Sequence, residues 1–225
     1  MQTTNEKMNI GDKIADFVQQ NRKGIFISFS LLVLAFIGLI AYFYISDSIN
    51  KKAIAGFEDL NTRFMELGND ISEGLASDEV ENLLSDLTEF TNKNKNGIAA
   101  SMAWSLIGTI YIERKEWIFA QDAWLNSART GDKTFMGPIA LFQAAAINEE
   151  IGKIERAIEL YTECVNHKFE FPAAARAQMS IGRLYEEIGD YDSAKEAFRA
   201  VMINWKDLPD WQNLARSRII AIDSR

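Results

Sequence analysis

An uninterrupted apolar run opens the hydrophobic pattern of this chain. Residues 25–45 (IFISFSLLVLAFIGLIAYFYI) contain no charged side chain, whereas most of the later sequence mixes polar and apolar positions at helical spacing. A helix over this run would be about 31 Å long at ~1.5 Å per residue, close to the hydrocarbon thickness of a bilayer. The pattern predicts one transmembrane helix that meets the lipid bilayer between Ile25 and Ile45.

Two other interpretations of this run fit less well. A secretory signal peptide has an apolar region of about 7–15 residues that ends in small residues at a cleavage site. Here the run ends in bulky Tyr42, Phe43 and Tyr44, which resemble the aromatic belt of a membrane interface. A buried core helix would need a second segment of comparable apolarity to cover it, and the sequence offers none. We therefore expect an uncleaved signal-anchor.

Basic residues on the two sides of the run indicate its orientation. Arg22 and Lys23 lie directly against its amino end, with Lys7 and Lys13 before them, whereas the trailing side carries fewer basic residues over a similar distance. Positive charge favours the cytoplasmic side. We expect residues 1–24 to form a short cytoplasmic tail of a single-pass protein in a bacterial inner membrane. The large domain that follows would then be periplasmic.

Three later segments repeat one pattern at a constant offset of 37 residues. Small residues recur where two helices of a hairpin would touch, and a large aromatic residue recurs near the end of each unit. The aligned positions are Gly108, Ala145 and Gly182, then Ala120, Ala157 and Ala194, then Trp124, Tyr161 and Phe198. Small residues allow close helix approach, and the aromatic side chains fill the space between successive hairpins. The repeat predicts a stack of helical hairpins.

The repeat also departs from strict regularity at named positions. Gly152 and Gly189 are expected to end the first helix of their units in a left-handed conformation, and Lys115 takes the equivalent place in the first unit. Asn148 stands where the other units have tyrosine. Three prolines follow the units instead of closing them, and we expect them to open the next helices: Pro138, Pro172 and Pro209.

These residues resemble the tetratricopeptide repeat, whose signature runs W-x₂-L-G-x₂-Y, then alanine, then an aromatic residue. The third unit, IGRLYEEIGDYDSAKEAF, is closest to that signature. The predicted fold class is all-α: a single amino-terminal transmembrane helix followed by a tetratricopeptide-repeat α-solenoid and a carboxyl-terminal capping helix. The repeats occupy residues 98–208.

The segments on either side of the repeats complete the predicted domain organisation. Residues 46–97 are expected to form a connecting helix and a degenerate first hairpin, with a break near residues 68–78 and Ser77 capping the helix after it. The segment 209–225 contains PDWQNLARSRIIAID, one amphipathic helix in the position of the cap that a solenoid requires.

Charge and rare residues limit the chemistry of the chain. The net charge is −8, which argues against nucleic acid as a partner and against the domain lying flat on anionic lipid. Cys164 and His167 are the only cysteine and histidine, and Cys164 occupies a small core position of the repeat. We expect packing there, with no metal, no cofactor and no enzyme activity. The doublets Glu149-Glu150 and Glu186-Glu187 are interpreted as solvated helix faces, with recognition of a basic partner as the alternative.

The first helix of each hairpin lines the inner face of such a stack, which predicts the protein-binding positions. They form a mixed surface with apolar side chains and flexible methionines that suits adaptable contacts. The candidates are Met102, Ser105 and Thr109 in the first repeat, Ile139 and Phe142 in the second, and Arg176, Met179 and Arg183 in the third. The two arginines are suited to a carboxylate group. The alternative is an unused groove with binding elsewhere.

The order of tail, anchor, helical hairpin, repeats and closing LARSRI helix resembles the bacterial family known as the ancillary SecYEG translocon subunit. The resemblance implies an inner-membrane protein beside the SecYEG translocon that receives exported polypeptides and passes them to periplasmic chaperones, without a cofactor. The competing hypothesis is a membrane-tethered scaffold that organises an envelope, motility or division complex. A scaffold would hold one folded partner, whereas a chaperone would meet many exported chains.

Overall fold

The computed structural model describes residues 10–224, and every regular element in that range is an α-helix, which confirms the all-α prediction. The helices are α1 (Ile10–Glu66), α2 (Gly68–Ser72), α3 (Asp78–Lys93), α4 (Ile98–Glu113), α5 (Trp117–Thr130), α6 (Met136–Glu150), α7 (Ile154–Val165), α8 (Ala174–Glu187), α9 (Tyr191–Asn204) and α10 (Pro209–Asp223). The chain divides into two compact units, Met1–Lys51 and Lys52–Arg225, and α1 contributes to both.

The first unit exposes the apolar run on a single helix. Among the described residues, one helix is long and apolar enough to cross a membrane, and none of its most apolar window is buried inside the protein. Phe26 and Phe36 are both more than two-thirds exposed. Such a surface is unfavourable in water and favourable in lipid, so the structure is compatible with the predicted span. The part of the predicted tail before residue 10 lies outside the described residues.

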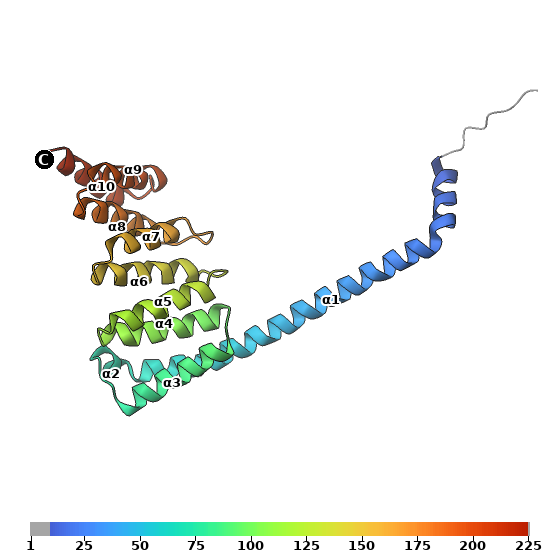
Figure 1. The fold of residues 1–225 in the computed structure, drawn as a ribbon, viewed down its shortest axis with the longest axis horizontal. Helices are drawn as coiled ribbons and strands as arrows, with labels where there is room; N and C mark the ends of the chain where they lie inside the picture. The colour runs from blue at the N-terminus through green and yellow to red at the C-terminus, as the bar shows by residue number, and fades with distance from the viewer. Residues whose placement is uncertain (1–9, 225) are drawn as a thin grey trace, which may run out of the picture. The chain divides into compact units, whose positions relative to one another are not determined.

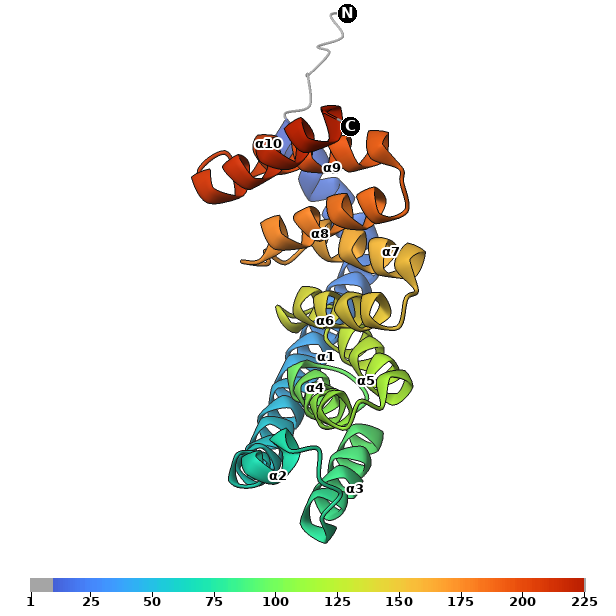
Figure 2. The same ribbon diagram turned by 90° about the vertical axis from the view of Figure 1, so that its left-hand side faces the viewer.

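The second unit is a stack of antiparallel hairpins (Figure 1). Helices α4 and α5, α6 and α7, and α8 and α9 pair within the three predicted repeats, and each hairpin packs on the next in chain order (Figure 2). Within the unit, the core runs through the stack and includes alanines at the predicted close contacts, all fully buried: Ala120, Ala157 and Ala194.

Close helix approach at the predicted glycines is required by the large aromatic residues opposite them. A Cβ atom added to Gly108 would overlap the Trp124 indole, and one added to Gly182 would overlap the Phe198 ring. Helices can approach this closely only where one of them lacks a side chain. The prediction that small residues permit close hairpin packing is therefore confirmed at both positions.

The turns inside the hairpins have the predicted left-handed residue. Gly152 has φ of 72° and Gly189 has φ of 80°, and each is the second residue after the end of a first helix. Lys115 takes the same conformation, with φ of 59°, although it carries a side chain. The turn geometry therefore persists where the glycine does not, at a cost of about 1 kcal/mol for a non-glycine residue in this region.

The connection between α1 and α3 is more ordered than predicted. The expected break near residues 68–78 contains the short helix α2, because buried Ile71 fixes the segment against the core and its backbone N–H donates to the Leu67 carbonyl at 3.0 Å. Ser77 caps α3 as predicted, since its hydroxyl accepts the Val80 backbone N–H at 3.4 Å.

The three prolines open helices to different degrees. Pro209 is the first residue of α10, and Pro138 lies in the first turn of α6, so both fit the prediction. Pro172 lies before α8, whose capping position is Ala173. Pro172 thus precedes its helix and does not form part of the first turn, contrary to the prediction.

Candidate protein-binding surface

The predicted positions on α4 contribute little free surface. Ser105 is buried, and its hydroxyl donates to the Met102 carbonyl at 2.7 Å. The Thr109 hydroxyl donates to the Ser105 carbonyl at 2.9 Å, and Met102 packs against the core formed with the first hairpin. These side chains are already occupied by local contacts, so the first repeat offers few groups to a partner.

The middle repeat presents an aromatic cluster around Phe142. Its ring lies 5.3 Å from the Tyr161 ring and 5.5 Å from the Phe171 ring, measured between centroids. The Arg176 guanidinium carbon lies 5.4 Å from the Phe142 centroid, in cation–π geometry. Ile139 is half-buried one helical turn before Phe142. The cluster brings two of the predicted site residues, Phe142 and Arg176, into direct contact.

A pocket of about 340 Å³ lies between α8 and α10, beside this cluster. It contains all three predicted positions of the third repeat. Its walls are Arg176, Met179, Ser180, Arg183, Phe198, Trp211, Leu214 and Arg218. Met179 is buried, so it forms part of the apolar floor and does not project as a free contact. Apolar walls with a few polar groups at the rim are typical of binding pockets.

Two of the three arginines of this pocket are held by carboxylates. An Arg183 guanidinium nitrogen lies 2.6 Å from Glu149 Oε2 on α6, and Arg218 Nε lies 3.1 Å from Glu186 Oε2 on α8. Glu186 is only 7% exposed. The interpretation of the acidic doublets as solvated faces is therefore wrong for Glu186, which is buried and pairs with α10, whereas Glu149 is half-buried and pairs with α8. Burial of Glu186 is tolerated because arginine pairs with it.

Arg176 differs from its two neighbours. No carboxylate of the described residues lies within ion-pair distance of its guanidinium, and its described partner is the Phe142 ring. An exposed cation next to an apolar floor can bind a carboxylate that carries an apolar side chain beside it. Within the described chain, Arg176 is therefore the arginine of this pocket available to a ligand.

Sequence reasoning missed the wall of the pocket that α10 provides. Trp211, Leu214 and Arg218 belong to the helix that was predicted only as a cap. The signal was present in the sequence, because a cap with a purely polar outer face does not need a tryptophan and a leucine three residues apart.

A second pocket, of about 510 Å³, lies between α5 and α7 and is lined in part by Arg156, Glu163 and His167.

Cys164 and His167 do not form a catalytic pair. Cys164 is 1% exposed, and its Sγ donates to the Pro138 carbonyl at 3.2 Å. Burial raises the pKa of the Cys164 thiol to about 12, so it stays protonated. His167 Nδ1 accepts the Phe169 backbone N–H, and its Nε2 lies 3.5 Å from Asp132. The predicted packing role of Cys164 is confirmed, and no group of potential metal ligands occurs among the described residues.

The geometry defines a class of protein. Stacked hairpins with glycine or alanine opposite a large aromatic residue form an α-solenoid of the tetratricopeptide type. The family model of the tetratricopeptide repeat matches residues 175–202, which lie in the unit predicted to be closest to the signature. The chain thus carries a tetratricopeptide repeat, a fold that typically provides a surface for binding other proteins.

Known proteins share sequence or structural similarity with this chain. A TPR repeat-containing protein of Treponema pallidum (strain Nichols) is 31% identical over 128 residues, which are 57% of this chain and 53% of the relative. The chain therefore matches about half the length of that bacterial protein. Two crystal structures of a Podosopora anserina protein with nearly identical TPR-like repeats are 12% identical and cover 75% of this chain, with TM-scores of 0.50 and 0.49. At that identity, the likeness concerns the fold alone.

Proposed function

We propose that this chain is a membrane-tethered, non-enzymatic protein-binding module. The observation that carries the proposal is the pocket between α8 and α10, where Arg176, which makes no ion pair with any described residue, borders an apolar floor. The exposed apolar helix of the first unit supplies the tether. The ligand suited to this pocket is a polypeptide segment that presents a carboxylate beside an apolar side chain.

More specifically, we propose an ancillary role at the SecYEG translocon, with the anchor in the inner membrane and the repeats on the periplasmic side. In that role, the solenoid receives exported polypeptides and passes them to periplasmic chaperones. The support is the resemblance in the order of tail, anchor and repeats, together with a pocket that accepts short apolar segments. The second candidate is a scaffold that holds one folded partner of an envelope, motility or division complex; the ion-paired, ordered rim at Arg183 and Arg218 favours it.

Site-specific photocrosslinking in native membranes tests both candidates. A photoreactive amino acid replaces Leu214, a pocket wall residue that is 46% exposed, and the matched control replaces Ile118, which is 56% exposed on α5 outside the pocket. We expect crosslinks from position 214 to many exported chains and to the translocon. Crosslinks to one stoichiometric partner without the translocon would support the scaffold instead. Equal crosslinking at both positions would contradict the assignment of the pocket.

The variant Arg176→Glu tests whether ligand binding depends on the pocket between α8 and α10 or on another surface. Because Arg176 makes no ion pair in the described chain, its reversal should leave the fold intact and weaken ligand capture about tenfold. The control is Arg199→Glu, an exposed arginine on α9 that is not part of the pocket. Unchanged capture by Arg176→Glu would show that binding occurs on another surface.

A further inference from the structure

The second unit has two long edges with different charge. We call "loop edge" the connections that follow α3, α5, α7 and α9, at residues 92–97, 129–136, 166–173 and 203–210. We call "turn edge" the connections on the opposite side, at residues 66–78, 113–117, 149–155 and 186–192. Antiparallel hairpins place all members of each set on the same side, and both edges are visible in Figure 1.

The loop edge is continuous across successive hairpins. The Gly97 backbone N–H donates to the Thr130 carbonyl at 3.0 Å, which joins the connection after α3 to the end of α5. Lys168 Nζ lies 2.9 Å from Asp132 Oδ2, which joins the connections after α5 and α7. These contacts join the first three connections of the loop edge, at residues 92–97, 129–136 and 166–173, into one surface.

Charge is distributed very unevenly between the two edges. The loop edge carries six basic and four acidic side chains, whereas the turn edge carries three basic and thirteen acidic ones. The basic residues of the loop edge are Lys93, Lys95, Arg129, Lys133, Lys168 and Lys206. Four of them, Lys95, Arg129, Lys133 and Lys206, form no ion pair within the described chain, because among the six only Lys93 and Lys168 pair with a carboxylate. The loop edge is thus a positive strip on a protein whose net charge is −8.

Large apolar side chains accompany this positive strip. Phe135 is 52% exposed, Leu208 is 40% exposed and Ile203 is 72% exposed. The turn edge also exposes apolar residues, for example Ile188 at 46%. Exposed apolar residues alone therefore do not distinguish the two edges. The loop edge differs because it combines exposed apolar residues with positive charge. Lysines around exposed aromatic and aliphatic residues are typical of surfaces that bind anionic membranes.

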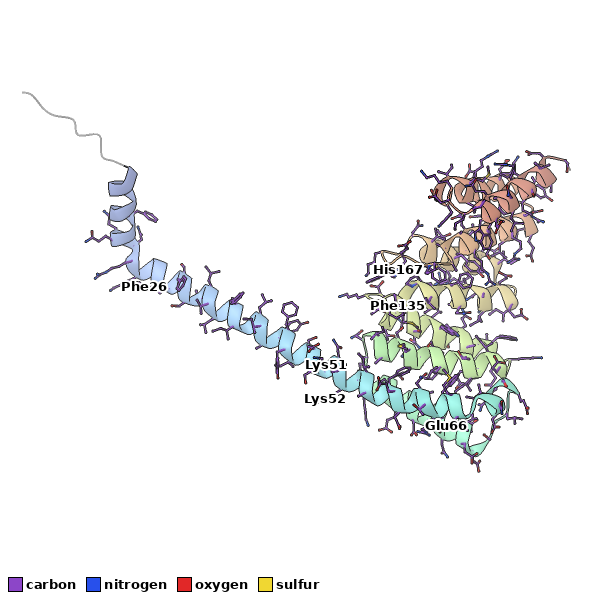
Figure 3. The ribbon with its side chains drawn as sticks, turned by 180° about the vertical axis from the view of Figure 1, so that it is seen from behind. Phe26, Lys51, Lys52, Glu66, Phe135 and His167 are labelled. Atoms are coloured by element: carbon purple, nitrogen blue, oxygen red, sulfur yellow. The ribbon has the colours of Figure 1, made fainter. Side chains whose placement is uncertain are left out.

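The covalent chain limits how far this edge can be from the apolar run. In the second unit, Phe57 of α1 packs on Phe90 near the end of α3, with 6.5 Å between ring centroids, so the beginning of this part of α1 lies at the loop edge. Figure 3 shows Lys52, Phe135 and His167 toward one edge and Glu66 away from it. Only residues 46–51 separate the apolar run from Lys52, and they can span at most about 25 Å, or ~10 Å as a helix.

We propose that the loop edge docks on the anionic headgroups of the bilayer that holds the apolar run. This inference rests on the proposed membrane tether. The lysines of the loop edge bind lipid phosphates, and Phe135 and Leu208 enter the interface between headgroups and acyl chains. The acidic turn edge faces away from the membrane. A net-acidic domain is thereby held edgewise on an anionic surface, although it would be repelled if it lay flat.

The test uses the full chain reconstituted in vesicles of neutral phosphatidylcholine, with or without about 30% phosphatidylglycerol. An environment-sensitive fluorophore is attached at Phe135→Cys, and the matched control is Ile188→Cys on the turn edge, with comparable exposure. The native Cys164 is buried and stays unlabelled. Quenching by a lipid-attached spin label reports contact with the bilayer.

We expect about threefold stronger quenching at position 135 than at 188 in anionic vesicles, and a loss of this difference at high salt or in the triple variant Lys95→Glu, Lys133→Glu, Lys206→Glu. Equal quenching at both positions, or equal quenching in neutral and anionic vesicles, would overturn the docking. Extraction of the protein from vesicles by alkaline carbonate would overturn the tether itself. Retained protein without quenching at position 135 would contradict only the docking.

Discussion

The middle and third repeats have the same helices at the same offset but meet through different residues. In the third repeat, Gly182 lies against Phe198, and no side chain fits between them. In the middle repeat, Ala145 and Tyr161 occupy the corresponding positions, and both are buried. A slightly larger residue on the first helix thus accompanies a different aromatic residue on the second. The comparison shows that the repeat keeps a small residue opposite a large aromatic one, while the combined volume of the pair differs between repeats.

Asn148 marks the second difference between these repeats. The third repeat has Tyr185 at this position, whereas Asn148 is fully buried and hydrogen-bonded. Its amide group donates to the Ala144 carbonyl at 2.7 Å and accepts from Gln121 Nε2 at 3.0 Å. A polar residue is tolerated in the core because both of its ends have partners. The middle repeat therefore uses a hydrogen-bonded link to α5 where the third repeat uses an aromatic ring.

Loss of the Phe198 ring from the third repeat should have the largest effect, far above loss of the Tyr161 hydroxyl from the middle repeat. Phe198→Ala deletes a fully buried ring opposite Gly182 and leaves a cavity, so we expect a loss of about 3–5 kcal/mol in the free energy of unfolding. Tyr161→Phe in the middle repeat keeps the ring and removes only a hydroxyl, whose bond to Glu149 is 3.4 Å long, and should cost below about 1 kcal/mol. Urea unfolding followed by circular dichroism measures both, and similar losses would contradict the comparison.

Substitution of the small residues Gly182 and Ala145 tests the same contacts from the opposite helix. Gly182→Ala places a methyl group against the Phe198 ring and should destabilise the protein by about 1–3 kcal/mol through overpacking, despite the higher helix propensity of alanine. Ala145→Gly should cost about 1 kcal/mol through lost propensity and a small void. The same unfolding assay applies. Stabilisation by Gly182→Ala would show that the two helices can separate at little cost.

The polar link of the middle repeat should have an intermediate effect. Asn148→Ala removes the side-chain donor to the Ala144 carbonyl and leaves Gln121 Nε2 without its acceptor, and we expect a loss of about 1–2 kcal/mol. Gln121→Ala is the control, since Gln121 is the half-buried partner of the link and Asn148 the fully buried one. If both variants and the double variant lose stability additively, the two residues do not act as a unit.

The smallest expected effect concerns the buried thiol. Cys164 occupies the position of Val201 in the third repeat, and its pKa is raised to about 12 from 9.0 by burial. Native protein at pH 8 should resist alkylation, whereas protein in urea should react completely. Because the thiol ionises at lower pH in the unfolded chain, its contribution to stability is full below pH 9 and is lost between pH 9 and about 12. Rapid labelling of native protein would contradict this burial.

Local patterns predicted the repeats well because each depends on residues close in sequence. The spacing of Gly108, Gly152 and Gly189 and the cap at Ser77 are all local signals, and the structure has the predicted contacts or conformations at these positions. The pocket was only partly predictable, because its far wall comes from α10 and its charge depends on ion pairs between repeats. Glu186 is an example: its position indicates a solvated face, and only the fold brings Arg218 to it.

Helix α10 packs on α8 and α9 in the described chain, and its docking has a thermodynamic consequence. The pocket at Arg176 exists only while Trp211 and Leu214 lie against α8. A ligand in that pocket therefore binds the docked state of the helix and not the undocked one, so occupancy and docking must reinforce each other by the same factor. Protection of the α10 backbone amides from hydrogen exchange would then rise with ligand concentration. This protection would measure the fraction of the protein that has ligand bound.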